Sequence, residues 1–469
     1  MHFVWLFIIS IFCSISQSQE LAQQKWENLK VIRAFDLSKG HTIERLQLLI
    51  KNVGNEPLSE FWVPIDGDVY NKTAFFTAIL PDSSAFLESG LSGEHSETVT
   101  VDGVAYYYGL VFLPTPIESG ETVHISIVHT YNSIAKPFPE YIDMGADQNL
   151  KLTTNLYPNS FYPTLEYTLV LAGSNDIKIN KLPKEASDPS LISKDETKTT
   201  IGPFTSISPL KTSKIDIVYS RNAPILRFSN LKREVWVSQW SSTVQFEEHY
   251  DAINDAAKLK DGFVRATWMS KQLAVVPRSH LAAFDVELPA DSSAHYYTDA
   301  VGMITTWKRF GDRLLLKPRF PLFGGWKSNF TLGWTNDLSQ FLHTVDNEEG
   351  IYLLSIPILN GPVDSTYDQI DLSVFLPEGS EVLDVTAPVN NPKITIDNKK
   401  SYFDLKQGHV KVTVEMKNLN DGLSQGTIFV RYKYNKDSFY MKPLSIGMNV
   451  FIALIAFFIM KRIDFSIEK

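Results

Sequence analysis

The chain has 469 residues, of which 44% are hydrophobic, 12% aromatic and 21% charged, and its net charge is −9. This length predicts two or three domains, since a single domain usually takes about 150 residues. The ordinary hydrophobic balance excludes wholesale disorder and a protein with many membrane spans. An acidic chain without a long basic run is not expected to bind nucleic acid.

An apolar run at the N-terminus has the length of a secretory signal peptide. The run FVWLFIISIFCSIS leads into small residues, and cleavage after Ser16 or Ser18 would satisfy the small-residue rule at both required positions. We therefore expect residues 1–18 to be a signal peptide. The only cysteine, Cys13, lies inside this run, so we expect a mature chain of the secretory pathway without disulfide bonds.

A second apolar run covers residues 444–460 and is followed at once by Lys461 and Arg462. As a helix with a rise of about 1.5 Å per residue, this run is about 25 Å long, which is close to the thickness of the hydrocarbon layer of the endoplasmic reticulum membrane. We predict a transmembrane helix over 441–460 and a short cytosolic tail over 461–469. With the signal peptide, this predicts a single-pass type I protein of the endoplasmic reticulum membrane, with most of the chain in the lumen.

Between these runs, apolar and polar residues alternate with a period of two, which is typical of half-buried strands. The segments that show this most clearly are ETVHISIV, TLEYTLVLAG, KIDIVYS, DQIDLSVFLP, HVKVTVEM and GTIFVRYKY. Helical segments do not alternate with these strands, which disfavours a βαβ fold. The sequence therefore predicts a mainly β fold of two tandem lumenal, antiparallel β-sandwich-like domains with a few helices.

The turn-rich segment YSRNAP marks the expected domain boundary, which gives domains over 19–222 and 223–440. Both halves close with a similar pattern. In the first half, TLVLAGSNDIKI is followed after a gap by SKIDIVYS. In the second half, LSVFLPEGSEVLDV is followed after a gap by HVKVTVEM. The pattern hints at a duplicated unit.

One longer helix is expected in the second domain. In the segment FEEHYDAINDAAKL, residues 246–259, helical spacing would bring Phe246, Tyr250 and Leu259 near one face. Ser242 and Gln245 fit a capping box before it, and Gly262 would end it. We predict that this helix packs over a sheet.

A possible metal site involves Asp66 and Asp68, because an Asp-x-Asp triplet can hold Mg²⁺ or Mn²⁺ under a nucleotide sugar. Pro64 and Gly67 instead favour an ordinary turn, and the doubly wound scaffold expected around a nucleotide sugar is not predicted. The sequence contains no zinc helix, nucleophile elbow or P-loop motif. We therefore predict no catalytic residue, no metal ion and no cofactor.

Two acceptor sequons for Asn-linked glycosylation occur, at Asn71 and Asn329. The motif is short, but a lumenal location makes modification of both asparagines expected. Asn329 lies beside FGGW, in a turn-rich stretch that should be accessible.

The predicted membrane helix carries a stripe of small and polar residues, namely Ser445, Asn449, Ala453 and Ala456. Small residues allow close helix packing, and an asparagine in a membrane seeks a hydrogen-bonding partner. A simple lipid-facing anchor needs neither property. We predict that this stripe docks against another membrane subunit.

Several long segments closely resemble the ribophorin I family, the alpha subunits of the eukaryotic oligosaccharyltransferase. The resemblance is carried by YSRNAP, REVWVSQWSSTVQFEEHYDAINDAAKLKDGF, KPRFPLFGGWKSNFTLGWTNDLSQFL, SIPILNGPVDSTYDQIDLSVFLPEG and SYFDLKQGHVKVT. It runs from about residue 26 to residue 460 and is densest from Tyr219 onward. The short tail KRIDFSIEK resembles the fungal form, since animal forms carry a cytosolic domain there. Ribosome binding is therefore not carried over.

The resemblance implies a noncatalytic subunit of the complex that transfers a preassembled oligosaccharide from dolichyl diphosphate to Asn of Asn-x-Ser/Thr in nascent polypeptides. It also implies partnership with sister subunits, including a multi-span catalytic subunit, and a scaffold role in presenting acceptor chains. Two alternatives remain open at the level of the sequence. One is a type I receptor or adhesion ectodomain, and the other is a self-contained glycosyltransferase that uses Asp66 and Asp68.

Overall fold

The computed structural model describes residues 25–462, apart from residues 82, 93–97, 102–103, 175, 187, 196, 274–275, 277, 346–348, 390–391, 401–403 and 405–407. The predicted signal peptide, its cleavage after Ser16 or Ser18, and the tail beyond residue 462 lie outside the described residues. Strands dominate the described part, and a long apolar helix closes it. The mainly β fold and the apolar C-terminal helix are thus confirmed.

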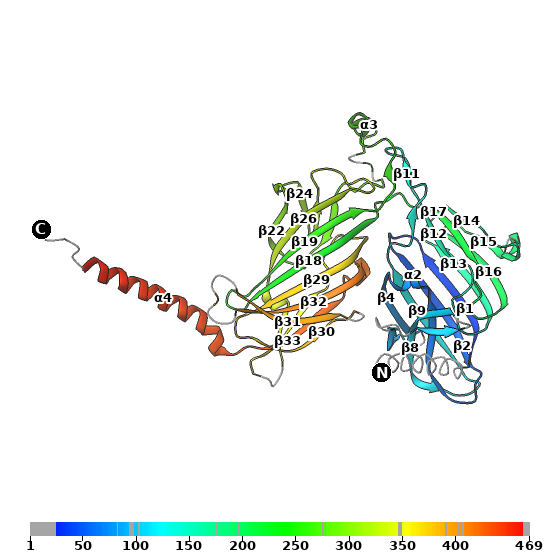
Figure 1. The fold of residues 1–469 in the computed structure, drawn as a ribbon, viewed down its shortest axis with the longest axis horizontal. Coiled ribbons are helices and arrows are strands. Elements are labelled where there is room, and N and C mark those ends of the chain that lie inside the picture. Colours follow the sequence, from blue (N-terminus) through cyan, green and yellow to red (C-terminus); the bar gives the residue numbers. More distant parts are fainter. Residues whose placement is uncertain are drawn as a thin grey trace, which may run out of the picture.

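The N-terminal half is built around an eight-stranded sheet of order β15-β16-β13-β1-β2-β9-β4-β5, drawn in blue to green in Figure 1. Smaller sheets of order β10-β12-β17-β14 and β3-β8-β6 accompany it, and β7 pairs with β8. The strands are β1 (Trp26–Asp36), β2 (Thr42–Asn52), β3 (Leu58–Ile65), β4 (Thr73–Leu80), β5 (Ala85–Leu87), β6 (Ser89–Leu91), β7 (Val99–Val101), β8 (Val104–Ile117), β9 (Thr122–Tyr131), β10 (Lys136–Pro137), β11 (Tyr141–Ile142), β12 (Asn149–Asn155), β13 (Thr164–Ala172), β14 (Ile177–Asn180), β15 (Ile192–Lys194), β16 (Lys198–Ile207) and β17 (Lys214–Ser220).

The C-terminal half contains an eight-stranded sheet of order β23-β22-β26-β19-β18-β29-β32-β31, with smaller sheets β27-β28-β33-β30 and β21-β25-β24. Its strands are β18 (Leu226–Ser238), β19 (Thr243–Asn254), β20 (Lys258–Leu259), β21 (Phe284–Glu287), β22 (Ser293–Asp299), β23 (Gly302–Met303), β24 (Trp307–Phe310), β25 (Arg313–Leu316), β26 (Lys327–Asp337), β27 (Leu342–Thr344), β28 (Ile351–Pro357), β29 (Ser365–Leu376), β30 (Glu381–Thr386), β31 (Lys393–Lys399), β32 (His409–Asn420) and β33 (Thr427–Lys433).

Helices contribute little apart from the last one. The α-helices are α2 (Gly67–Tyr70), α3 (Arg265–Ser270) and α4 (Lys436–Arg462), and the 3-10 helices are η1 (Lys184–Ala186), η2 (Pro189–Leu191), η3 (Leu338–Gln340) and η4 (Asp421–Leu423). Figure 1 shows α4 projecting from the C-terminal half, on the side away from the N-terminal half.

Both halves share one sheet topology. In each, the first two strands form a hairpin (β1–β2, β18–β19), and a later strand joins the first in parallel (β13 or β29). The remaining neighbours then follow in corresponding order in both large sheets, and β14–β17 corresponds to β30–β33 in the smaller sheets. The predicted correspondence was therefore wrong in one place. SKIDIVYS forms β17, whose counterpart is β33, while HVKVTVEM belongs to β32, whose counterpart is β16.

Most strand pairs are antiparallel as predicted, but β1–β13 and β18–β29 are parallel. The alternation of apolar residues reports which face of a strand is buried, and it carries no information on the direction of its neighbour. The parallel pairing arises because the chain crosses to the smaller sheet before it returns beside its first strand.

The predicted helix over 246–259 is wrong, because most of this segment is strand β19. Side chains alternate between buried and partly exposed along the strand, and Phe246, Glu248 and Tyr250 all point inward. Because Glu248 occupies an inward position, the alternation of apolar and polar residues is interrupted there. The nearest inward apolar residues, Phe246 and Tyr250, are then four residues apart, which is also the spacing of one face of a helix. The buried guanidinium of Arg233 on β18 explains why an acid occupies that position.

Buried apolar side chains form two large clusters, one for each half. In the N-terminal half, Phe35 and Ile127 of the large sheet meet Ile217 of a smaller sheet. In the C-terminal half, Val374 of the large sheet meets Val430 of a smaller sheet. Facing sheets thus enclose each core in the manner of a sandwich.

Candidate functional site

Two residues separate the end of strand β33 from the start of the C-terminal helix α4. Its 27 residues extend for about 40 Å. Among the residues that the structure describes, it is the one helix long and apolar enough to cross a membrane, and its apolar part is not buried by any of them. This exposure is what a helix that meets lipid or another membrane helix requires.

The predicted stripe lies entirely within α4. Ser445, Asn449, Ala453 and Ala456 follow one another at spacings that keep them on one side of the helix, and Asn449, Ala453 and Ala456 are exposed. The described residues of this chain offer Asn449 no partner at that depth. The docking role of the stripe stays a prediction.

The two halves meet at a polar junction that the sequence reasoning missed. The guanidinium of Arg221, at the end of β17, pairs with the Asp364 carboxylate just before β29. The other Asp364 oxygen accepts from the Gly40 backbone N–H at 2.9 Å, and Arg221 also donates to the Ser38 carbonyl at 3.3 Å. One carboxylate therefore ties the β1–β2 loop of the N-terminal half to the C-terminal half.

A second acid extends the junction. Asp421, in η4, accepts from Lys39 Nζ at 2.9 Å and from the backbone N–H of Asp364 at 3.0 Å. His41 Nδ1 lies 3.6 Å from the other Asp421 oxygen. Burial lowers the pKa of His41, although the Asp421 carboxylate opposes that change. His41 therefore belongs to the junction as a neutral, packed side chain at neutral pH.

Asparagine side chains complete the contact. Asn132, directly after β9, donates to the carbonyls of Asn418 and Leu419 at 2.8 and 3.0 Å. Asn418 donates in turn to the Asn71 carbonyl at 2.8 Å. Because these bonds satisfy backbone groups of one half with side chains of the other, they hold the halves in a defined orientation.

The connecting segment is fixed as well. Gln148 donates to the carbonyls of Arg221 and Ala223, both at 3.1 Å, and its amide oxygen accepts from the Ala257 N–H at 2.6 Å. Beside it, β11 of the N-terminal half pairs in parallel with β20 of the C-terminal half. These contacts join residues far apart in sequence, so no local pattern predicts them. The one available signal for Arg221 and Asp364 was that they lie in YSRNAP and GPVDSTYD, two of the stretches that carry the family resemblance.

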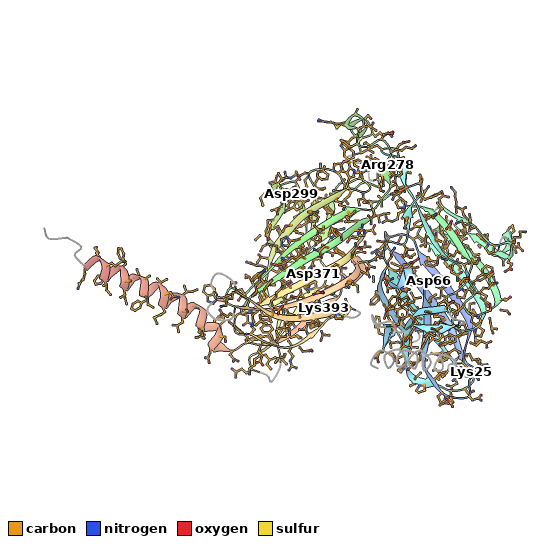
Figure 2. The ribbon with its side chains drawn as sticks, viewed as in Figure 1. Lys25, Asp66, Arg278, Asp299, Asp371 and Lys393 are labelled. Atoms are coloured by element: carbon orange, nitrogen blue, oxygen red, sulfur yellow. The ribbon has the colours of Figure 1, made fainter. Side chains whose placement is uncertain are left out.

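The Asp66–Asp68 segment forms the start of a short helix. The Asp66 carbonyl accepts from the N–H groups of Val69 and Tyr70 at 2.9 and 2.8 Å, and both carboxylates are exposed. Within the described ranges, no group of three or more His, Cys, Asp or Glu side chains is placed to hold a metal ion. Figure 2 places Asp66 on the N-terminal half, far from α4. The turn interpretation accounts for these residues.

Both sequons present an exposed asparagine. Asn71 follows α2, and the hydroxyl of Thr73 is buried against His129 Nε2 at 2.9 Å. Asn329 lies in strand β26, opposite Asp251 of β19, rather than in the expected turn. Its side chain is on the exposed face of that strand, so accessibility is preserved.

Comparison with known proteins decides the family. The family model described as Ribophorin I matches residues 26–461, from the first strand to the end of α4. The chain belongs to the ribophorin I family. The match includes both halves, the junction between them and the apolar helix, so the whole described architecture is that of a ribophorin I protein.

Similar relatives come from a plant, a yeast and a worm. The chain is 28% identical over 453 residues to dolichyl-diphosphooligosaccharide–protein glycosyltransferase subunit 1A of Arabidopsis thaliana, covering 94% of this chain and 70% of that protein. It is 26% identical to subunit 1 of Schizosaccharomyces pombe, covering 92% and 93%, and 25% identical to subunit 1 of Caenorhabditis elegans, covering 96% and 74%. These ribophorin I relatives are named as subunits of a glycosyltransferase.

Proposed function

We propose that this chain is a noncatalytic subunit of the oligosaccharyltransferase, the complex that transfers a preassembled oligosaccharide from dolichyl diphosphate to asparagine in nascent polypeptides. The observation that carries the proposal is the ribophorin I match over residues 26–461, together with relatives named as subunit 1 of that enzyme. The receptor and self-contained glycosyltransferase alternatives have no such support.

Its role in the complex is that of a scaffold. Two β-rich domains, over 19–222 and 223–440, stand on one membrane helix, and the junction of Arg221, Asp364 and Asp421 supports a fixed angle between them. A rigid body of this kind can hold a nascent polypeptide near a separate catalytic subunit with many spans. The stripe on α4 supplies the surface on which sister subunits pack.

Co-purification tests this function. We expect the full-length chain, extracted from membranes in digitonin, to bring with it a multi-span transferase, and its depletion to cause underglycosylation while the lipid-linked donor accumulates normally. A purified chain that turned over a sugar donor, and lost that activity in Asp66→Ala, would instead establish the glycosyltransferase alternative. Recovery without any multi-span partner would favour the receptor alternative.

We further propose that the chain is a type I protein of the endoplasmic reticulum with a cleaved signal peptide over 1–18 and both halves in the lumen. The exposed side chains of Asn71 and Asn329, one in each half, support this orientation. An endoglycosidase should increase the mobility of the mature chain, and Asn71→Gln and Asn329→Gln should each remove one step of that shift.

The sequon at Asn329 has a matched control. Thr331→Ser keeps the hydroxyl that the sequon requires and should retain the glycan, whereas Thr331→Ala should remove it. A chain that endoglycosidase leaves unchanged, with both asparagines intact, would contradict the lumenal assignment.

A further inference from the structure

The first turn of α4 faces the folded body across a groove. A groove of about 520 Å³ lies between this turn and the end of the large sheet, and its lining includes Gln239, Ser242, Tyr434 and Phe439. Gln239 also donates to the Tyr432 hydroxyl at 2.8 Å, on the strand that leads into the helix. The β18–β19 turn, residues 239–242, is thereby tied to β33 and lies across the groove from the base of α4.

A second turn, between β29 and β30, approaches the first turn of α4 closely. Gly379, between β29 and β30, has a φ of +87°, and a Cβ on it would lie 2.7 Å from the Ser438 hydroxyl oxygen. Only glycine permits this close approach. Phe439 packs against the apolar core of the C-terminal half, so the base of α4 is joined to the folded body. The depth of α4 in a membrane therefore also sets the height of the β18–β19 turn.

That height follows from the helix rise. Phe439, which lines the groove, precedes the first residue of the apolar run, Leu444, by five residues. At about 1.5 Å per residue this places Phe439 about 8 Å outside the hydrocarbon layer. The headgroup region on each side of a bilayer is about 5–8 Å thick. The β18–β19 turn therefore stands level with the lipid headgroups.

The residue at the tip of this turn suits that level. Trp240 is 72% exposed, and among the tryptophans that the structure describes it is the only exposed one. An exposed indole in water has no stabilising role in the fold, whereas tryptophan is enriched where an apolar body meets a wet, polar headgroup layer. Tyr440, which follows Phe439 in α4, is exposed as well.

We propose that the β18–β19 turn is a second membrane contact of this protein, in which Trp240 inserts into the headgroup layer on the side from which α4 emerges. The partner of this surface is phospholipid, because the apolar ring and the polar N–H of an indole suit the boundary between acyl chains and headgroups. A single helix leaves the tilt of the folded body towards the bilayer surface weakly restrained, and a second contact beside the helix limits that tilt. The C-terminal half then stands on the membrane in one orientation, which a scaffold requires.

The inference rests on α4 spanning the membrane, and the experiment separates the two. The full-length chain with Cys13→Ser would be placed in phosphatidylcholine nanodiscs, with a nitroxide attached to Ser241→Cys in the turn. Collisions with oxygen and with a water-soluble nickel chelate would be measured by electron paramagnetic resonance. Labels on Phe86→Cys, exposed on β5, and on Ala453→Cys, within the span, serve as water and bilayer references.

We expect the label at 241 to show a several-fold loss of nickel collisions relative to the label at 86, and this loss to be reversed when Trp240→Ala is added. Equal nickel access at 241 and 86 would overturn the membrane contact while leaving the span intact, provided that the label at 453 is oxygen-rich. Protection at 241 from both reagents would mean a protein neighbour, and it would overturn the contact too. Frequent nickel collisions of the label at 453 would show that α4 does not span the bilayer, and the inference would then be wrong as well.

A label at Ser242→Cys, which leaves the Trp240 indole in place, provides an independent measurement in the same turn. It should collide with oxygen more than with nickel, relative to the label at 86. If it does not, the turn lies in water and the proposal is wrong.

Discussion

Each half of the molecule buries an arginine against a glutamate between its first two strands. Arg33 Nε lies 2.6 Å from Glu44, whose second oxygen accepts from the Tyr131 hydroxyl at 3.1 Å. In the C-terminal half, the fully buried Arg233 and Glu248 form the corresponding pair. Burial raises the pKa of Glu44, but the Arg33 charge and the donated hydrogen bonds outweigh it and lower the pKa. These pairs occupy inward positions where an apolar residue would be expected.

Breaking one of these pairs should be costly. In Glu248→Ala, the Arg233 guanidinium stays buried without its counter-charge, so we expect a loss of about 3–5 kcal/mol in the free energy of unfolding. Denaturant unfolding of the full chain in detergent would measure it. Glu415→Ala, which removes an exposed pair with Lys393, is the matched control and should cost below about 1 kcal/mol. Equal effects in both variants would contradict the role of burial.

His129 makes stability depend on pH. It is packed near Glu44, Arg33 and Tyr131, and burial lowers its pKa from 6.5 to about 4, which the Glu44 charge only partly opposes. The folded state therefore favours the neutral imidazole, and this contribution is present above pH 6.5 and is lost as the pH falls towards 4. The loss should approach about 3 kcal/mol over that interval.

In His129→Gln, the decline in the free energy of unfolding between pH 6.5 and 4.5 should become shallower. His124→Gln, on the same strand with its side chain half-buried on the other face, should leave the decline in place. Denaturant titrations at several pH values would compare the slopes. Identical slopes in His129→Gln and the unmodified chain would contradict this assignment.

At the scale of elements, β19 shows where a sequence pattern misleads. Its inward positions include Phe246, Glu248 and Tyr250, so one polar residue in an otherwise apolar series hid a strand. Helix propensity also favoured the wrong choice, because the segment contains three alanines and two glutamates. Pairing with β18 and β26 over nearly its full length outweighs that local preference.

The helix α4 allows a direct test of the packing stripe. Asn449→Leu combined with Ala453→Leu removes the polar group and the close-packing surface, so we expect weaker association with membrane partners. The control is Phe451→Leu with Phe458→Leu, which lie on the opposite side of the helix by its periodicity. Quantitative co-purification from digitonin compares the two. Unchanged recovery of partners with the stripe variant would show that α4 is a plain lipid anchor.

At the scale of the whole molecule, the junction decides how the halves are oriented. Arg221 is almost fully buried there, and its partner Asp364 lies in a loop with a φ of +55°, which aspartate tolerates better than most residues. The loop conformation and the ion pair therefore support each other. The contacts to Gly40 and Asp421 add bonds on both sides of the boundary.

Removal of this carboxylate should loosen the two halves. In Asp364→Ala, Arg221 and the Gly40 N–H lose their acceptor, at an expected cost of about 1–3 kcal/mol. Hydrogen exchange of residues 38–41 and 418–421 should become faster, and the radius of gyration should rise. Asp371→Ala, later on β29 and labelled in Figure 2, is the matched control and should change neither quantity. Unaltered exchange in Asp364→Ala would show that the asparagine contacts suffice.

The sequence alone determined the features that depend on local composition. Period-two alternation established the mainly β fold, and the long apolar run near the C-terminus established the helix that could cross a membrane, since burial in a core or a bilayer imposes both patterns directly. Long irregular segments such as KPRFPLFGGWKSNFTLGWTNDLSQFL identified the family. The tertiary structure decided the parallel pairs, the strand at 243–254, the junction at Arg221 and Asp364, and the position of Trp240 beside α4. Each of these depends on residues far apart in the chain, whose proximity arises only when the sheets assemble.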